Sequence, residues 1–174
     1  MSYQQIKLTK RGKELIQRTL ESGTDLEFRE VRLSSQYYNQ DELEDLTDLA
    51  NIQQTETLSQ AKRLTDGNIQ LSTLFNNERV SNGFTVNTIG VYATNPDQVE
   101  ETILYGITST DENPFYMAPY SVNPISLTLN LTVGIGEAEN FSINVNPAGA
   151  ASQEDIQELR EAIDIMLGGE TVDE

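Results

Sequence analysis

The chain contains 174 residues, of which 28 are acidic and 11 basic, so its net charge is −17, and it has neither cysteine nor histidine. This length fits one domain, or one domain with a short appendage, that can bury a core without cross-links. The missing residue types exclude disulfides, thiolate and imidazole metal sites, and Ser–His or Cys–His dyads. The negative charge also argues against binding to nucleic acid and to anionic membranes.

The first helix is predicted over residues 10–22. Thr9 is a suitable N-cap, and Gly23 allows a left-handed end to the helix. Gly12 indicates close packing against a neighbour or a tolerated glycine. Four residues form an apolar stripe that we expect to lie on a sheet: Leu15, Ile16, Thr19 and Leu20.

Basic residues are concentrated near the N-terminus. Residues 1–32 have a net charge of +2, whereas the remaining 142 residues have a net charge of −19. One interpretation is a solvated amphipathic helix beside a strand. The other is a docking face for an acidic neighbour, which includes another copy of this chain, formed by Lys10, Arg11, Lys13 and Arg18.

A strand with an irregularity is predicted over residues 25–33. Leu26 and Phe28 alternate, and Val31 and Leu33 alternate one residue out of step. A two-residue period that slips by one indicates either a β-bulge or a strand whose two ends bury opposite faces.

The acidic segment 37–52 has leucines three residues apart, at positions 43, 46 and 49, which indicates a short helix or 3₁₀ stretch in a long connection. Its five carboxylates do not follow the order of an EF-hand calcium loop. We therefore interpret them as a solvated face: Asp41, Glu42, Glu44, Asp45 and Asp48.

Further strands are predicted along the rest of the chain. Residues 53–64 and 68–76 flank Asp66-Gly67, which predicts a hairpin. Residues 83–94 are expected to pair with 102–108 across an acidic turn. Residues 125–133 and 141–145 alternate cleanly and are expected to form a pair joined by the turn at 134–137.

A proline-punctuated loop over residues 111–124 is rich in aromatic residues. One interpretation is a lid over the core. The other is a platform that stacks on a sugar of a glycan, formed by Phe115, Tyr116 and Tyr120.

Seven β runs after an opening helix predict an α+β domain, in which the N-terminal helix packs on a mainly antiparallel sheet or sandwich. We expect this domain to cover residues 1–146, followed by a small-residue linker at 147–151. Residues 152–174 are expected to form a short coiled-coil-like helix and an acidic tail.

The C-terminal segment begins with a capping box, Ser152 and Asp155. Asp155 at position g and Arg160 at the following position e would meet across a parallel coiled coil. An amphipathic helix lying on its own sheet predicts the same spacing, but the linker and the terminal position favour self-association. The predicted oligomer interface therefore contains Asp155 and Arg160 together with the residues at heptad positions a and d. These are Ile156, Leu159, Ile163 and Met166.

No catalytic motif is found. The chain has no phosphate-binding glycine loop and no Gly-x-Ser-x-Gly element. Among 28 acidic residues some pair always has the spacing for glycoside hydrolysis, which is no evidence for an enzyme. We therefore expect no catalytic residue, no cofactor and no metal. Without an apolar N-terminal run or a long apolar stretch, we also expect no secretory signal and no membrane helix.

The order of several segments resembles phage tail-fibre (tail-collar) proteins. Leu8-Thr-Lys-Arg-Gly-Lys-Glu-Leu15 and the segment 22–33 match their opening helix and Leu-x-Phe-x-x-Val-x-Leu strand. Gly83-Phe-Thr-Val-Asn-Thr-Ile-Gly-Val-Tyr-Ala-Thr-Asn-Pro-Asp97, Ile103-Leu-Tyr-Gly106 and the helix opening at 152–155 continue the similarity, which covers about residues 3–167.

This resemblance implies a structural protein of a phage tail or baseplate, or of a phage-tail-like bacteriocin, made in the host bacterial cytoplasm. It implies a trimer that anchors or connects a fibre through contacts with other tail, baseplate or fibre proteins. A module that binds carbohydrate or a receptor on the host cell surface is the alternative.

Overall fold

The computed structural model describes residues 5–136 and 141–143. Within them, α1 spans Lys10–Ser22 and the 3₁₀ helix η1 spans Leu43–Asp45. The strands are β1 (Lys7–Leu8), β2 (Leu26–Ser34), β3 (Ile52–Thr57), β4 (Gln60–Arg63), β5 (Ile69–Asn76), β6 (Phe84–Val86), β7 (Thr88–Asn95), β8 (Gln98–Ser109), β9 (Phe115–Met117), β10 (Ser126–Val133) and β11 (Phe141–Ile143).

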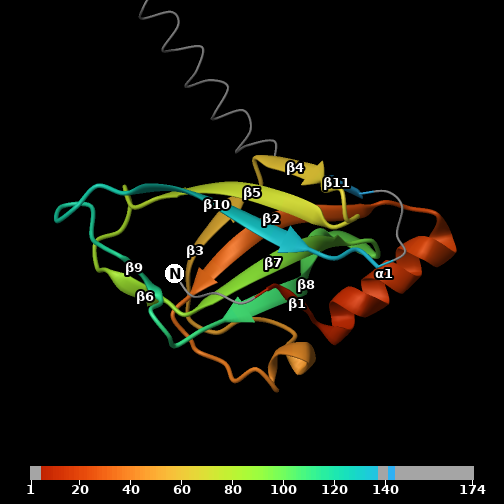
Figure 1. The fold of residues 1–174 in the computed structure, drawn as a ribbon, viewed down its shortest axis with the longest axis horizontal. Helices are drawn as coiled ribbons and strands as arrows, with labels where there is room; N and C mark the ends of the chain where they lie inside the picture. The colour runs from red at the N-terminus through yellow and green to blue at the C-terminus, as the bar shows by residue number, and fades with distance from the viewer. Residues whose placement is uncertain (1–4, 137–140, 144–174) are drawn as a thin grey trace, which may run out of the picture. The chain divides into compact units, whose positions relative to one another are not determined.

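These strands form three sheets (Figure 1). The largest has the order β1-β8-β7-β2-β11, and β3 pairs with β2 beside β11. The second sheet has the order β10-β5-β4, and the third contains β6 and β9. The pairing of β11 with β2 is parallel, and every other pairing in the described residues is antiparallel.

The described residues are mainly β, with 49% strand and 12% helix, so the predicted α+β class is wrong. Curled sheets enclose the core, and α1 is the one α-helix among the residues that the structure describes. The coiled-coil-like helix of that prediction, with Asp155, Ile156, Leu159, Arg160, Ile163 and Met166, lies outside the described residues, as do the linker and the domain boundary near residue 146. The described helices include none that is long and apolar enough to cross a membrane.

Helix α1 begins and ends where the sequence predicts. The Thr9 hydroxyl accepts a hydrogen bond from the Gly12 amide at 2.9 Å, and Gly23 adopts a left-handed conformation with φ 71°. Leu15, Ile16 and Thr19 are buried, as expected. Leu20, however, is 40% exposed, because it lies at the edge of the buried stripe rather than within it.

The irregular alternation in β2 is caused by a β-bulge. The register of β2 against β7 shifts between Phe28 and Glu30, so one extra residue lies on β2. Because of this bulge, the side chains on both halves of the strand enter the same core: Leu26, Phe28, Val31 and Leu33. The alternative of two opposite buried faces is therefore wrong.

Two of the predicted strands are each divided between sheets. The run 53–64 is interrupted at the buried Leu58, so β3 belongs to the largest sheet and β4 to the second. The run 83–94 is likewise interrupted at Asn87, which separates β6 from β7. The hairpin at Asp66-Gly67 is confirmed between β4 and β5, and the pairing of β7 with β8 is also confirmed.

The last described strand has a different partner from the one predicted. β11 pairs in parallel with the first residues of β2, not with β10. Strand β4 lies on its other side, where the Arg63 guanidinium is 5.4 Å from the centre of the Phe141 ring. Alternation predicted the strand but carries no information on which edge it joins.

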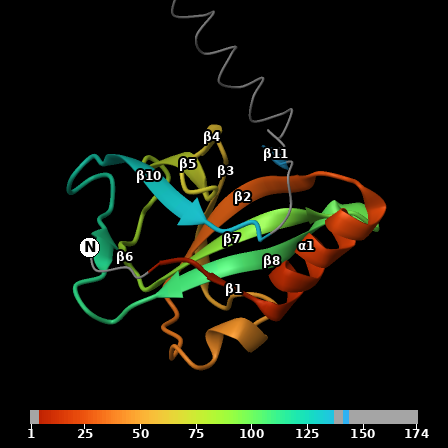
Figure 2. The same ribbon diagram turned by 45° about the vertical axis from the view of Figure 1, so that its right-hand side comes forward.

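The core occupies both faces of the largest sheet. One face packs against α1 and the second sheet around Phe28 and Tyr105, whose ring centroids are 5.0 Å apart. The other face is covered by the long connection after β2, where Leu43 and Leu49 pack on Tyr92. Figure 2 shows this connection on the opposite side of β7 and β8 from β10.

Candidate functional site

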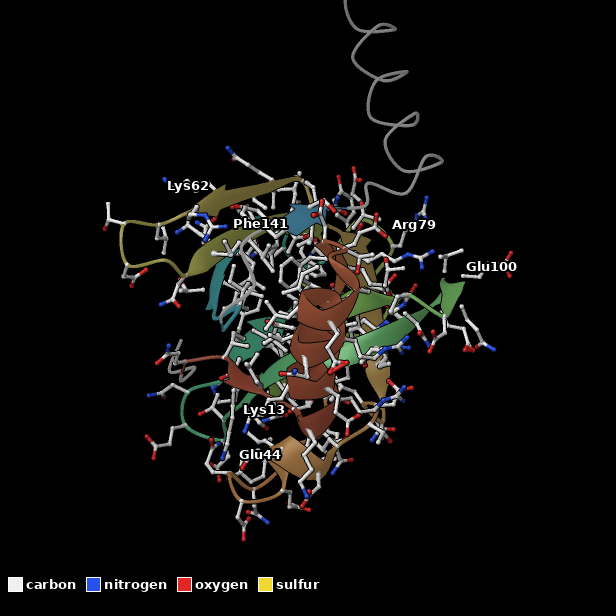
Figure 3. All side chains as sticks on the ribbon, turned by 90° about the vertical axis from the view of Figure 1, so that its right-hand side faces the viewer. Lys13, Glu44, Lys62, Arg79, Glu100 and Phe141 are labelled. Atoms are coloured by element: carbon white, nitrogen blue, oxygen red, sulfur yellow. The ribbon has the colours of Figure 1, made fainter. Side chains whose placement is uncertain are left out.

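The basic face of α1 has acidic partners within the chain. Figure 3 shows Lys13 and Glu44 side by side, and their charged atoms are 2.5 Å apart. Lys10 Nζ is also 2.5 Å from Asp45 Oδ1. These pairs link the first turns of α1 to η1, so the connection itself supplies an acidic neighbour to this part of the helix.

The other two residues of the predicted docking face differ from each other. Both terminal nitrogens of Arg18 donate to the Asp97 carboxylate, at 2.6 and 2.5 Å, which joins α1 to the turn between β7 and β8. Arg11 is exposed, and no ion pair of Arg11 is found among the described residues. The docking face stays a prediction, and three of its four basic residues form ion pairs with acidic residues of the same chain.

The acidic segment is tied to the sheet at one further point. The Tyr92 hydroxyl donates to Asp48 at 2.7 Å, and the Arg32 guanidinium lies 4.0 Å from the centre of the Tyr92 ring. Arg32 Nε also donates to Glu30 at 2.6 Å. Burial and the hydrogen bond to Asp48 raise the pKa of Tyr92. This cluster holds the connection in place, and no spacing in the sequence indicates it.

The described residues contain no group of three or more acidic, histidine or cysteine side chains arranged to hold a metal ion. Glu44, Asp45 and Asp48 instead point to different cationic or hydroxyl partners, as described above. Glu44, Asp45 and Asp48 therefore act as structural partners of basic or hydroxyl side chains.

We expect the pKa of Glu44, measured by NMR titration, to be below that of an ordinary glutamate. The cause is the hydrogen bond and charge of Lys13, with a smaller effect of Lys7. Because ionisation is favoured in the folded state, this stabilisation is present above the ordinary glutamate pKa and is lost as the pH falls through the lowered value. Lys13→Ala should bring the pKa back up, and Lys62→Ala should not change it; an unchanged value in Lys13→Ala would contradict the ion pair.

The aromatic loop is divided between core and surface. Phe115 and Met117 lie on β9, where Met117 is fully buried and Phe115 packs against the core. Tyr116 and Tyr120 are 54% and 46% exposed. Of the three predicted glycan contacts, Phe115 is therefore part of the lid over the core, and the two tyrosines present ring surface to solvent.

A polar groove that sequence reasoning missed lies beside β3. It has a volume of about 430 Å³. Its walls come from β3 and from the segment that follows β5, and the residues are Gln53, Gln54, Thr55, Glu56, Arg79, Val80, Ser81, Asn82 and Phe84. In the sequence these residues belong to two ordinary polar runs about 25 positions apart, so only the tertiary structure brings them together.

No protein-family model, no curated protein and no solved structure matches the chain.

Proposed function

We propose that the chain is a structural component of a phage tail or baseplate, or of a phage-tail-like particle, and connects the tail to fibre or receptor-binding subunits. In this role it assembles as a trimer and contacts other tail, baseplate or fibre proteins. Its work is to hold these subunits in position, without catalysis, cofactor or metal.

The observation that carries the proposal is the packing of the segments that resemble tail-fibre proteins. Thr9 of the first segment donates its hydroxyl to the Leu104 carbonyl at 2.5 Å. Phe28 of the second segment packs edge-on against Tyr105 and pairs with Ala93 of the third. Segments far apart in the sequence thus form one continuous unit, which supports a shared domain rather than unrelated short similarities.

Two measurements test this function. Light scattering of the full chain should give a mass near three times the 19.4 kDa of one copy. Cryo-electron microscopy of particles from the producing bacterium should then place the chain in the tail or baseplate. A monomer at every concentration, together with its absence from assembled particles, would contradict the proposal.

Glycan binding is a second candidate, supported by the two half-exposed rings of the aromatic loop. Exposed tyrosine rings offer apolar faces on which sugar rings stack. Binding on a glycan array that Tyr116→Ala abolishes, and that the matched variant Tyr37→Ala leaves unchanged, would favour it. An array with no bound glycan would remove this candidate.

A further inference from the structure

The polar groove runs along an unpaired strand edge. Four consecutive residues of β3, 53–56, line it. Successive side chains of a strand point to opposite faces, so four in a row share one groove only where that groove follows the edge of the strand. No described strand pairs with β3 on the side away from β2. The groove therefore exposes backbone as well as side chains.

The hydrogen-bond pattern shows which backbone groups face the groove. The Leu58 amide donates to the Arg29 carbonyl at 3.4 Å, and in an antiparallel pair such bonded positions alternate. Gln54 and Glu56 therefore bond to β2, whereas Thr55 and Thr57 direct their backbone groups away from it. The Thr57 carbonyl fits this pattern, because it accepts from the Thr73 hydroxyl at 2.9 Å on that side. Thr55 offers one amide and one carbonyl to the groove.

The opposite wall limits what can enter. Residues 79–82 and Phe84 stand across from β3, so the edge is recessed rather than prominent. Two recessed edges of this kind cannot approach to the 4.7–4.9 Å that strand pairing requires. A single extended segment can approach to this distance, because it is not part of a larger sheet that would collide with the opposite wall. The Phe84 ring is partly buried and packs against the core.

The groove lining contains one acidic and one basic side chain, Glu56 and Arg79. Glu56 is half-buried, and no ion pair of Glu56 within 4.0 Å is found in the described part of the chain. Burial raises its pKa, although the charge of Arg79 opposes this shift. The neighbouring Gln54 donates to the Asn76 carbonyl at 2.8 Å, but its own oxygen is buried without a donor among those residues. Among the described residues, the Glu56 carboxylate and the buried Gln54 oxygen therefore accept no hydrogen bond.

We propose that the groove binds an extended peptide segment of a partner subunit, which adds to β3 as a further strand through the Thr55 backbone. The segment carries a lysine or arginine whose charged group reaches Glu56. Strand addition of this kind obtains affinity from the main chain and specificity from alternate side chains. The identity of the partner as a subunit rests on the proposed function, whereas the groove and its preference for a basic strand do not.

The test uses the full chain, labelled for NMR, and the capped peptide acetyl-Thr-Val-Lys-Val-Thr-amide. Two further peptides carry N-methyl groups on alternate amides, in the two possible phases. We expect the unmodified peptide to shift the signals of residues 53–56 and 79–82 and to slow exchange of the Thr55 amide at least tenfold. One of the two methylated peptides should lose this effect, because an N-methyl amide cannot donate.

Three variants sharpen the result. Glu56→Gln should weaken binding of the lysine peptide about fivefold, the upper range for a partly exposed ion pair, and should not change binding of the same peptide with norleucine. Glu78→Gln makes the same charge change next to the groove lining and should have no effect. Thr55→Pro removes only the amide that faces the groove, which an edge strand tolerates, and should abolish binding with an unchanged thermal melt.

Three outcomes would overturn the proposal. The first is no shift of the NMR signals at 5 mM peptide, and the second is equal binding of the unmodified peptide and both methylated peptides. The third is the same signal shifts caused by glucose or N-acetylglucosamine but not by peptide. If Thr55→Pro unfolds, the methylated peptides and Glu56→Gln decide. A different result would separate the two proposals: a chain that is monomeric and absent from particles, yet binds the lysine peptide. This result would refute the tail function but support the groove as a peptide-binding site.

Discussion

Replacing Phe28 by alanine is expected to destabilise the fold by about 3–5 kcal/mol, the range for removing a buried aromatic ring. Phe28 is fully buried, lies directly before the β-bulge and packs edge-on against Tyr105. The cavity would open at the contact between two of the segments that build the core. Since a domain of this size is stable by roughly 5–15 kcal/mol, the variant should unfold at much lower urea concentration, as followed by circular dichroism.

Two controls define this prediction. Phe28→Leu keeps most of the volume and should lose only about 1 kcal/mol. Val99→Ala removes an exposed apolar side chain and should change the free energy of unfolding by less than about 0.5 kcal/mol. A Phe28→Ala protein as stable as Val99→Ala would show that this ring is not part of the core.

Gly12→Ala is expected to destabilise the protein by about 2 kcal/mol, although alanine is the better helix former. Gly12 lies where α1 crosses β8, and a Cβ atom there would overlap with the Tyr105 carbonyl oxygen. This carbonyl also accepts the Thr9 amide at 3.1 Å, so it cannot move without loss of the helix start. Overpacking of this kind costs about 1–3 kcal/mol, which exceeds the 0.5–1 kcal/mol that alanine contributes to a helix.

The sign of the change makes the test decisive. Helix propensity alone predicts that Gly12→Ala raises the urea midpoint, whereas close packing predicts that it lowers the midpoint. Arg11→Ala alters the adjacent exposed position and should leave the midpoint nearly unchanged. A stabilised Gly12→Ala protein would show that the helix can move away from β8 at little cost.

Local features of the fold could be predicted because their causes lie within a few residues. Thr9 and Gly23 define the ends of α1 through backbone groups of that helix alone. The slip in alternation after Phe28 indicated a bulge in β2 as one of two alternatives, and Asp66-Gly67 predicted the hairpin between β4 and β5. Each of these signals depends on geometry that the neighbouring residues determine.

The site could not be predicted in the same way. Gln53 and Asn82 give no sign in the sequence that they line one groove, and the sequence left open whether Phe115 belongs to a lid over the core or to a glycan contact. The predicted α+β class failed for a related reason. That prediction was based on the order of helix and strand elements along the chain. The structure shows curled sheets, and the chain crosses from one sheet to another at Leu58 and at Asn87.

The sequence by itself determined the lack of histidine and cysteine chemistry, the first helix, most strand positions and the excess of negative charge. Only the tertiary structure decided which strands share a sheet, why Lys10 and Lys13 face Glu44 and Asp45, and that no described strand pairs with one edge of β3. The physical reason is that a strand satisfies its backbone with partners distant in the chain, and alternation of side chains specifies a face of the strand but never the partner at its edge.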